Sequence, residues 1–179
     1  MNKVIDNVLP IEQFLIIKNT VESNTLPWFH QSHVSYVPGE ETEIGKTDDI
    51  SMTPLQKKYN YYLQHTIFEK HMIACSETLW DLLIPIFDIA EVKSLIRCKI
   101  NYFPQTPELV HHKKHRDAEF PHKGAIFYLN NNDGLTILED GTEIENLENR
   151  LLLFDSSKDH NGTTCTNADR RLLINFSYF

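Results

Sequence analysis

GAIFYLNNNDGLTILEDGTEIENLENRLLLFD, residues 124–155, is the stretch of the chain that decides the fold. Its short apolar runs are separated by Asn131-Asn132-Asp133-Gly134 and by Asp140-Gly141, and both segments are strong turn signals. Short apolar runs divided by such turns are typical of β-strands joined by tight loops. The stretch therefore predicts a series of short strands.

The same character extends from residue 95 to the end of the chain. We expect strands at residues 96–103, 109–117, 124–130, 135–139, 142–147, 150–155, 157–161 and 170–178. Eight short strands behind a helical layer favour a double-stranded β-helix, the cupin-like jelly roll, which presents its ligand site between the two sheets. We therefore expect a mainly β jelly-roll core at residues 95–179.

The first half of the chain carries mostly helical signals. One helix follows Pro10, a second begins at Thr53 and is predicted to run to about Lys70, and a third begins at Ser76. Pro85 should kink or split the third helix, and the polar stretch at residues 40–49 predicts a loop. We expect residues 1–94 to form a mainly helical α+β support region that buttresses one sheet.

Length and composition limit the class of protein. The chain has 179 residues, 41% hydrophobic and 23% charged, which is ordinary for one globular domain spanning residues 1–179. The net charge of −8 argues against a nucleic-acid partner, which normally needs a broad basic surface. No apolar run approaches the ~20 residues that span a bilayer, and the first six residues lack the apolar segment of a signal peptide. Three cysteines without CxxC spacing fit free thiols in a reducing compartment. We therefore expect a cytoplasmic protein with no membrane partner.

The triplet His115-Arg116-Asp117, followed much later by His160, carries a candidate metal site. Two imidazoles and one carboxylate form the facial triad that holds non-haem Fe(II) and leaves coordination positions open. Side chains two apart on a strand point to the same face, so His115 and Asp117 could bind one ion together. Arg171, a short way downstream, would suit an anionic co-substrate.

The order of these motifs resembles the Fe(II)/2-oxoglutarate-dependent dioxygenases, in particular their prolyl-hydroxylase-like branch. The resemblance covers residues 95–179, just under half of the chain. It rests on Asn101-Tyr102, His115-Arg116-Asp117, Ile126-Phe127-Tyr128-Leu129-Asn130, Asn149-Arg150-Leu151-Leu152-Leu153-Phe154, His160 and Arg171-Leu172-Leu173-Ile174-Asn175-Phe176.

The resemblance implies roles for individual residues. It assigns Fe(II) to His115, Asp117 and His160, which would be the catalytic metal ligands. It assigns the distal carboxylate of 2-oxoglutarate to Arg171, with help from Tyr128 and, as a weaker match, from Tyr102.

The resemblance also implies a reaction. The cofactors would be Fe(II) and the co-substrate 2-oxoglutarate, with O2 as oxidant and ascorbate as a candidate reductant. The reaction would be hydroxylation of a peptidyl proline or a similar substrate, with release of succinate and CO2.

Several alternatives stay open. The substrate could be a free amino acid or another small molecule, or the chain could be a catalytically silent jelly roll that binds a partner. A silent relative would be expected to lose a metal ligand, and this chain keeps all three. His111 and His115 could bind zinc if their segment were helical, which Pro107 and Pro121 disfavour. Arg170 competes with Arg171, because neighbouring strand residues face opposite ways.

Two local features need separate mention. The chain reads Asp133-Gly134-Leu135 where the family usually has Asp-Gly-Gly. The basic run at residues 111–116 contrasts with the acidic chain and predicts either a solvated loop or a surface that steers an acidic or carboxylate-bearing substrate. We expect His112 and His122 to be solvent-exposed.

Overall fold

The computed structural model describes residues 2–34 and 52–179, so the loop predicted at residues 40–49 lies outside the described residues. Three helices are described: α1 (Ile11–Val21), α2 (Pro54–Lys58) and α3 (Glu77–Ile89). The strands of the described residues are β1 (Lys3–Ile5), β2 (Phe29–Gln31), β3 (Tyr62–Glu69), β4 (Met72–Ile73), β5 (Leu95–Pro104), β6 (Lys123–Tyr128), β7 (Asn132–Ile137), β8 (Glu143–Asn146), β9 (Arg150–Asp155), β10 (Asn161–Gly162) and β11 (Arg170–Tyr178). Among these helices, none combines the length and apolar character needed to cross a bilayer.

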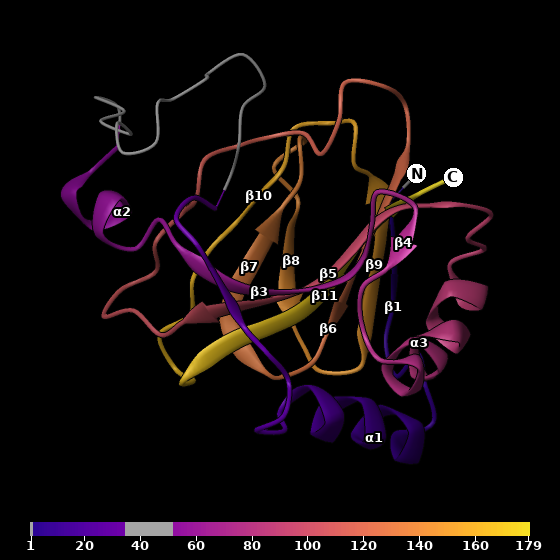
Figure 1. Ribbon diagram of the computed structural model, residues 1–179. Coiled ribbons are helices and arrows are strands. Elements are labelled where there is room, and N and C mark those ends of the chain that lie inside the picture. The colour runs from indigo at the N-terminus through magenta and orange to yellow at the C-terminus, as the bar shows by residue number, and fades with distance from the viewer. Residues whose placement is uncertain (1, 35–51) are drawn as a thin grey trace.

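The strands form two antiparallel sheets (Figure 1). The major sheet has the order β1-β9-β6-β11-β5-β3-β2, with β4 paired to β3, and the minor sheet has the order β10-β7-β8. Leu138, just after β7, and Ile144 of β8 pack in one cluster with Ile126 and Leu173 of the major sheet, so the two sheets face each other. The mainly β architecture that the sequence predicts is confirmed, and it is consistent with a jelly-roll oxygenase fold.

The two faces of the major sheet have different tasks. On β5, Cys98 and Ile100 belong to the large core that includes residues of α1 and α3, whereas Lys99, Asn101 and Phe103 line a cavity on the other face. Successive strand residues point to opposite faces, so this alternation follows directly from the pleat. Helices α1 and α3 cover the first face (Figure 1), which leaves the second face for ligands.

The predicted helix from Thr53 to about Lys70 is wrong beyond its first turns. Its start is confirmed, because Thr53 and Gln56 form a capping box, but α2 ends at Lys58 and the chain then enters β3. Strand β3 pairs with both β2 and β5, and these long-range hydrogen bonds override the local helical spacing. Residues 1–94 are therefore not mainly helical, since they add four strands to the major sheet.

Two smaller predictions also need correction. Residues 109–117 form no strand and make only single bridges, His111 to Thr163 and His115 to His160. Helix α3 is not split by Pro85. The carbonyl of Asp81, which Pro85 deprives of its helical hydrogen bond, belongs to an exposed residue, where water can replace the missing donor.

Candidate active site

His115 and His160 are brought together by their own main chains. The N–H of His115 donates to the carbonyl of His160 at 2.9 Å, and the N–H of His160 donates back at 3.0 Å. Each ring is also oriented through Nδ1, which lies 3.3 Å from the Lys113 carbonyl in His115 and 3.0 Å from the Lys158 carbonyl in His160. A neutral imidazole that donates from Nδ1 presents an unprotonated Nε2, which is the form that binds a metal.

Asp117 completes the cluster, and hydrogen bonds fix both of its carboxylate oxygens. Its Oδ2 accepts from Ser156 and, at 3.1 Å, from Ser177, and its Oδ1 accepts from Arg97 at 3.0 Å. Burial alone would raise the pKa of Asp117, but Arg97 and then His160 outweigh it and hold that pKa below its ordinary value. The carboxylate is therefore ionised and fixed before any ligand binds.

The three side chains form a metal-binding geometry. One potential ligand atom from each of His115, Asp117 and His160 lies within 4.8 Å of the others. Burial, followed by the proximity of His160, lowers the pKa of His115 to about 4, so this imidazole is neutral at pH 7. Two imidazole nitrogens and one carboxylate fit the facial triad of Fe(II). The expected pairing of His115 with Asp117 thus arises without the strand from which it was predicted.

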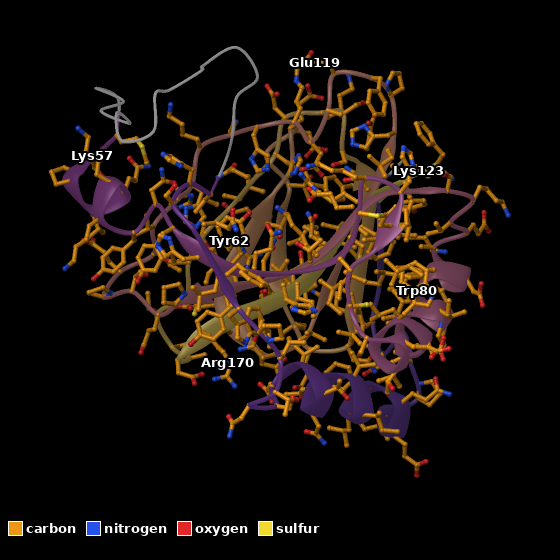
Figure 2. All side chains as sticks on the ribbon, in the orientation of Figure 1. Lys57, Tyr62, Trp80, Glu119, Lys123 and Arg170 are labelled. Atoms are coloured by element: carbon orange, nitrogen blue, oxygen red, sulfur yellow. The ribbon has the colours of Figure 1, made fainter. Side chains whose placement is uncertain are left out.

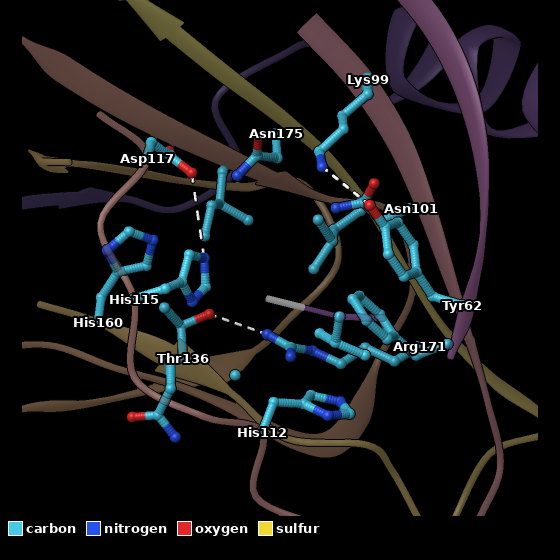
Figure 3. Close-up of a pocket in the computed structure, with 16 residues that line it drawn as sticks. Tyr62, Lys99, Asn101, His112, His115, Asp117, Thr136, His160, Arg171 and Asn175 are labelled. Atoms are coloured by element: carbon cyan, nitrogen blue, oxygen red, sulfur yellow. Dashed lines mark hydrogen bonds and ion pairs between the residues drawn. The ribbon is translucent and has the colours of Figure 1, made fainter. Parts of the chain in front are cut away.

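The cluster opens into a cavity of about 70 Å³ between the two sheets (Figure 3). The residues that line it are Val34, Tyr62, Lys99, Asn101, Phe103, His112, His115, Asp117, Ile126, Thr136, His160, Asn161, Gly162, Arg171, Leu173 and Asn175. Arg171 therefore lines the same cavity as the three candidate metal ligands.

Arg171 is a buried cation, only 1% exposed, whose partners are neutral. Its Nε donates to Asn146 at 2.9 Å, and its two terminal nitrogens donate to the Thr163 carbonyl and to Thr136, both at 2.8 Å. No carboxylate of the described chain pairs with it. A guanidinium has five N–H groups, so these three hydrogen bonds do not use all of its donors. A buried cation without an acidic partner is costly unless an anion joins it.

Arg170 faces away from this cavity. It pairs with Glu22 at 2.8 Å and with Asp169 at 2.7 Å, and Figure 2 shows it near the end of α1. The strand pleat thus separates two adjacent arginines, and only Arg171 can meet a ligand between the sheets.

Neither tyrosine assigned by the resemblance reaches the cavity. Tyr128 is fully buried, and its hydroxyl donates to Thr136 at 2.8 Å. Thr136 lines the cavity, whereas Tyr128 lies behind it. Tyr102 lies opposite Leu172 on the helix-covered face, 5.6 Å from the ring of Trp28. The prediction for Tyr102 is wrong, because it belongs to the alternate set of β5 residues.

The sequence did not single out several residues that do line the cavity, notably Tyr62, Lys99, Asn101, Thr136 and Asn175. A lysine and an asparagine inside the apolar strand Leu95–Pro104 were the available signal. The expectation that His112 and His122 are exposed is also wrong, since they are 5% and 6% exposed. His112 lies in the cavity wall, where burial, with a contribution from Arg171, lowers its pKa to about 3.

A second, larger groove of about 650 Å³ meets the cavity at the candidate metal ligands. It is shaped by β2, β3 and β5 and by the segment that carries His115 and Asp117. Most of the side chains that line the groove are polar or charged. The exceptions are Phe29, Val34 and the aromatic ring of Tyr62. The arrangement gives a deep cavity behind the metal site and a wider approach in front of it.

Comparison with known proteins identifies the fold. No protein-family model matches the chain, and no curated protein is similar to it in sequence. Solved structures similar to the chain include the following three. A viral collagen prolyl hydroxylase from Paramecium Bursaria Chlorella virus-1, in complex with 2OG (2-oxoglutarate), has a TM-score of 0.59 at 10% identity, covering 98% of this chain and 94% of that one.

A prolyl hydroxylase from Trichoplax adhaerens, bound to a peptide of the hypoxia inducible factor oxygen degradation domain, has a TM-score of 0.60 at 12% identity, covering 99% and 83% of the two chains. The non-heme alpha ketoglutarate dependent epimerase SnoN has a TM-score of 0.60 at 12% identity, covering 99% and 77%. The chain thus has the fold of the 2-oxoglutarate- and Fe(II)-dependent oxygenases. Its fold neighbours include prolyl hydroxylases, in agreement with the resemblance seen in the sequence.

Proposed function

We propose that this protein is an Fe(II)- and 2-oxoglutarate-dependent oxygenase in which His115, Asp117 and His160 hold the iron. The observation that carries the proposal is the shared cavity: three converging metal donors and a fully buried arginine without an acidic partner line the same small space. The three metal donors need a cation, and the buried arginine needs an anion. A co-substrate that chelates iron at one end and carries a carboxylate at the other satisfies both.

The co-substrate carboxylate is proposed to lie between Arg171 and Thr136. Arg171 is a planar, permanently charged fork whose hydrogen bonds within the protein leave donor capacity unused, which suits a carboxylate. Thr136 accepts hydrogen bonds from both Tyr128 and Arg171, so its own hydroxyl proton is free to donate into the cavity. Tyr128 then acts indirectly, by fixing Thr136.

The residues around the iron position prepare it for chemistry. The Lys113 and Lys158 carbonyls fix the two imidazoles, while Arg97 and the two serines fix Asp117. When bound, iron and 2-oxoglutarate supply the oxidation that converts a substrate C–H to C–OH with O2 while 2-oxoglutarate becomes succinate and CO2, and ascorbate is the proposed reductant for maintaining Fe(II). The protein's own part is to orient the reactants and exclude water.

The primary substrate is proposed to be a peptidyl proline or a small molecule such as a free amino acid. Two of the similar structures are prolyl hydroxylases, which supports the first, whereas the epimerase of the same fold supports a small-molecule substrate. Fold alone is a weak guide to substrate. We further infer that residues 1–179 act as one domain, because β1 and β3 complete the same sheet as β5 and β11.

The test is an anaerobic titration of the metal-free protein with Fe(II) and then 2-oxoglutarate. We expect the weak visible charge-transfer band that this class of enzyme shows. Asp117→Ala serves as the control and should not give the band, while circular dichroism should show that it remains folded. Iron binding by the wild type without any band after addition of 2-oxoglutarate would overturn the proposal.

A further inference from the structure

Lys99 stands where the deep cavity meets the larger groove. Both spaces share Val34, Tyr62, Lys99, His115 and Asp117, so this junction lies directly beside the candidate iron ligands. In Figure 3 Lys99, Tyr62 and Asn101 are grouped on one side of the cavity, apart from His115 and His160. A substrate that enters by the groove therefore meets Lys99 next to the iron position.

Lys99 differs from the other cations of the groove because it has no acidic partner. Arg97 pairs with Asp117 at 3.0 Å, and Arg116 pairs with Asp159 at 2.6 Å. The ammonium of Lys99 donates only to the hydroxyl of Tyr62, at 3.0 Å, and lies 5.3 Å from the centre of that ring. Glu69 also lines the groove but makes no ion pair with Lys99. Among the described residues, then, Lys99 is half-buried and forms no ion pair. Burial lowers the pKa of Lys99 to about 7, so an anion bound beside it would stabilise its charged ammonium form.

The neighbouring polar groups are also unsatisfied. The side-chain oxygens of Asn101 and Asn175 are buried, line the cavity, and have no hydrogen-bond partner in the described part of the chain. Buried amides of this kind normally pair with protein or ligand groups. Because an amide carries both a donor and an acceptor, either asparagine can turn its NH2 toward an anion. Lys99, Asn101 and Asn175 thus lie on one wall of the cavity, where they can bind a negatively charged partner.

We propose that Lys99, together with Tyr62 and Asn101, binds a carboxylate of the primary substrate, so that the substrate is a carboxylate-bearing molecule oxidised close to that group. The inference rests on the proposed function and adds the class of substrate. The ammonium provides the charge, and the Tyr62 hydroxyl and the Asn101 amide give the site direction. Lys99 lines both the cavity and the groove. The exposed Lys114 of the basic run lines neither of them, so the charge that meets the substrate comes from Lys99.

The co-substrate does not need Lys99. Arg171 and Thr136 already provide donors for its distal carboxylate within the cavity, whereas Lys99 also lines the groove through which a second molecule must arrive. Loss of Lys99 should consequently weaken the response to substrate and leave the affinity for 2-oxoglutarate unchanged. This separation is what the experiment measures.

The probes are the twenty free L-amino acids and the same residues capped as N-acetyl amides. Each is added to the Fe(II)- and 2-oxoglutarate-loaded protein, and succinate release above the uncoupled rate is recorded in air. Perturbation of the charge-transfer band is recorded without oxygen as a binding signal. Every free amino acid carries an α-carboxylate, whereas only capped aspartate and glutamate retain a carboxylate. The two sets therefore distinguish a free amino acid from an acidic side chain in a peptide.

We expect responses from free amino acids or from the capped acids, and none from capped neutral residues. Lys99→Met should weaken binding of the responding probe at least tenfold, as expected when a buried charge pair loses one partner. Lys99→Arg should retain most of it. Lys93→Met, at an exposed lysine, is the matched control.

Three results with the substrate probes would overturn the inference. They are a response to capped neutral residues as strong as to carboxylates, a Lys99→Met variant that binds the responding probe like the wild type, and the absence of any response to the carboxylate probes. A normal charge-transfer band in wild-type protein would show in each case that the proposed function itself survives. If Lys99→Met instead lost affinity for 2-oxoglutarate, Lys99 would belong to the co-substrate site and the inference would also fail.

Discussion

The main chains of His115 and His160 exchange two hydrogen bonds, of 2.9 and 3.0 Å, although neither residue belongs to a strand of the two sheets. This single antiparallel bridge sets the imidazole centroids 4.6 Å apart. Two segments separated in the chain by β6, β7, β8 and β9 are therefore joined at the point where a metal needs both rings. The backbone, more than the side chains, defines the candidate metal centre.

Replacing the His160 side chain should remove a metal ligand and keep this bridge. His160→Gln should lower Fe(II) affinity by more than about 100-fold, because losing a supporting partner of a ligand alone costs about 10–100-fold. His122→Gln is the matched control, since His122 is equally buried and its Nδ1 lies 2.8 Å from the carbonyl two residues earlier. Calorimetric titration with Fe(II) under argon measures both. Equal affinities for the two variants would remove His160 from the metal centre.

Thr136 should matter more to 2-oxoglutarate than Tyr128 does. Thr136→Val keeps the shape of the side chain but leaves the Tyr128 hydroxyl and one N–H of Arg171 without an acceptor, at about 1–3 kcal/mol for each unsatisfied group. We expect the affinity for 2-oxoglutarate to fall about tenfold, and by less than about threefold in Tyr128→Phe. Titration of the charge-transfer band reports both values. The reverse ranking would mean that Tyr128 contacts the co-substrate directly.

The sequence predicted those parts of the site that depend on motif order and on the pleat of a strand. Arg171 and Arg170 face opposite sides because adjacent residues of β11 must do so. The resemblance led to an error at Tyr102, because the choice of which alternate residues of β5 face inward depends on its register with β11 and β3. Local sequence does not specify that register.

The cavity residues that the sequence did not predict are brought to the cavity by long-range backbone pairing. Tyr62 reaches the cavity only because β3 lies beside β5, and the helical spacing of that segment hid the strand. His112 was expected to be exposed because it sits in a basic run, yet the bridge from His111 to Thr163 places it in the cavity wall. Neither pairing has a local sequence signal.

The buried His112 should make the metal-free protein sensitive to acid. Burial lowers its pKa to about 3 in the folded protein, against about 6.5 when unfolded. Between these values the unfolded chain binds the extra proton, so the free energy of unfolding decreases as the pH falls below about 6.5. At pH 5 this amounts to about 2 kcal/mol.

Urea denaturation of the chelator-treated protein at pH 7, 6 and 5 tests this dependence. His112→Gln removes the titrating group, so its unfolding free energy should fall less than that of the wild type, by about 2 kcal/mol at pH 5. His115 titrates in both proteins, and its contribution therefore cancels from the comparison. Parallel pH dependences would show that His112 is accessible to protons in the folded state.

The last prediction concerns the two glycines that make room for Arg171. A Cβ at Gly162 would lie 2.8 Å from a terminal nitrogen of Arg171, whereas a Cβ at Gly134 would lie 2.7 Å from its Cδ and 2.8 Å from the backbone oxygen of Thr164. The guanidinium can retreat only by giving up its hydrogen bonds, while the Thr164 backbone cannot retreat without moving the chain. The two substitutions should therefore have different effects.

Gly162→Ala should displace the guanidinium and lower the affinity for 2-oxoglutarate at least tenfold. Gly134→Ala should instead destabilise the protein by about 1–3 kcal/mol, as overpacking of a filled interior does. Thermal unfolding and titration with 2-oxoglutarate, applied to both variants, separate the two effects. If Gly162→Ala bound 2-oxoglutarate as tightly as the wild type, the co-substrate carboxylate would have to lie away from that face of Arg171. The anion that this buried cation needs would then have to be a different molecule.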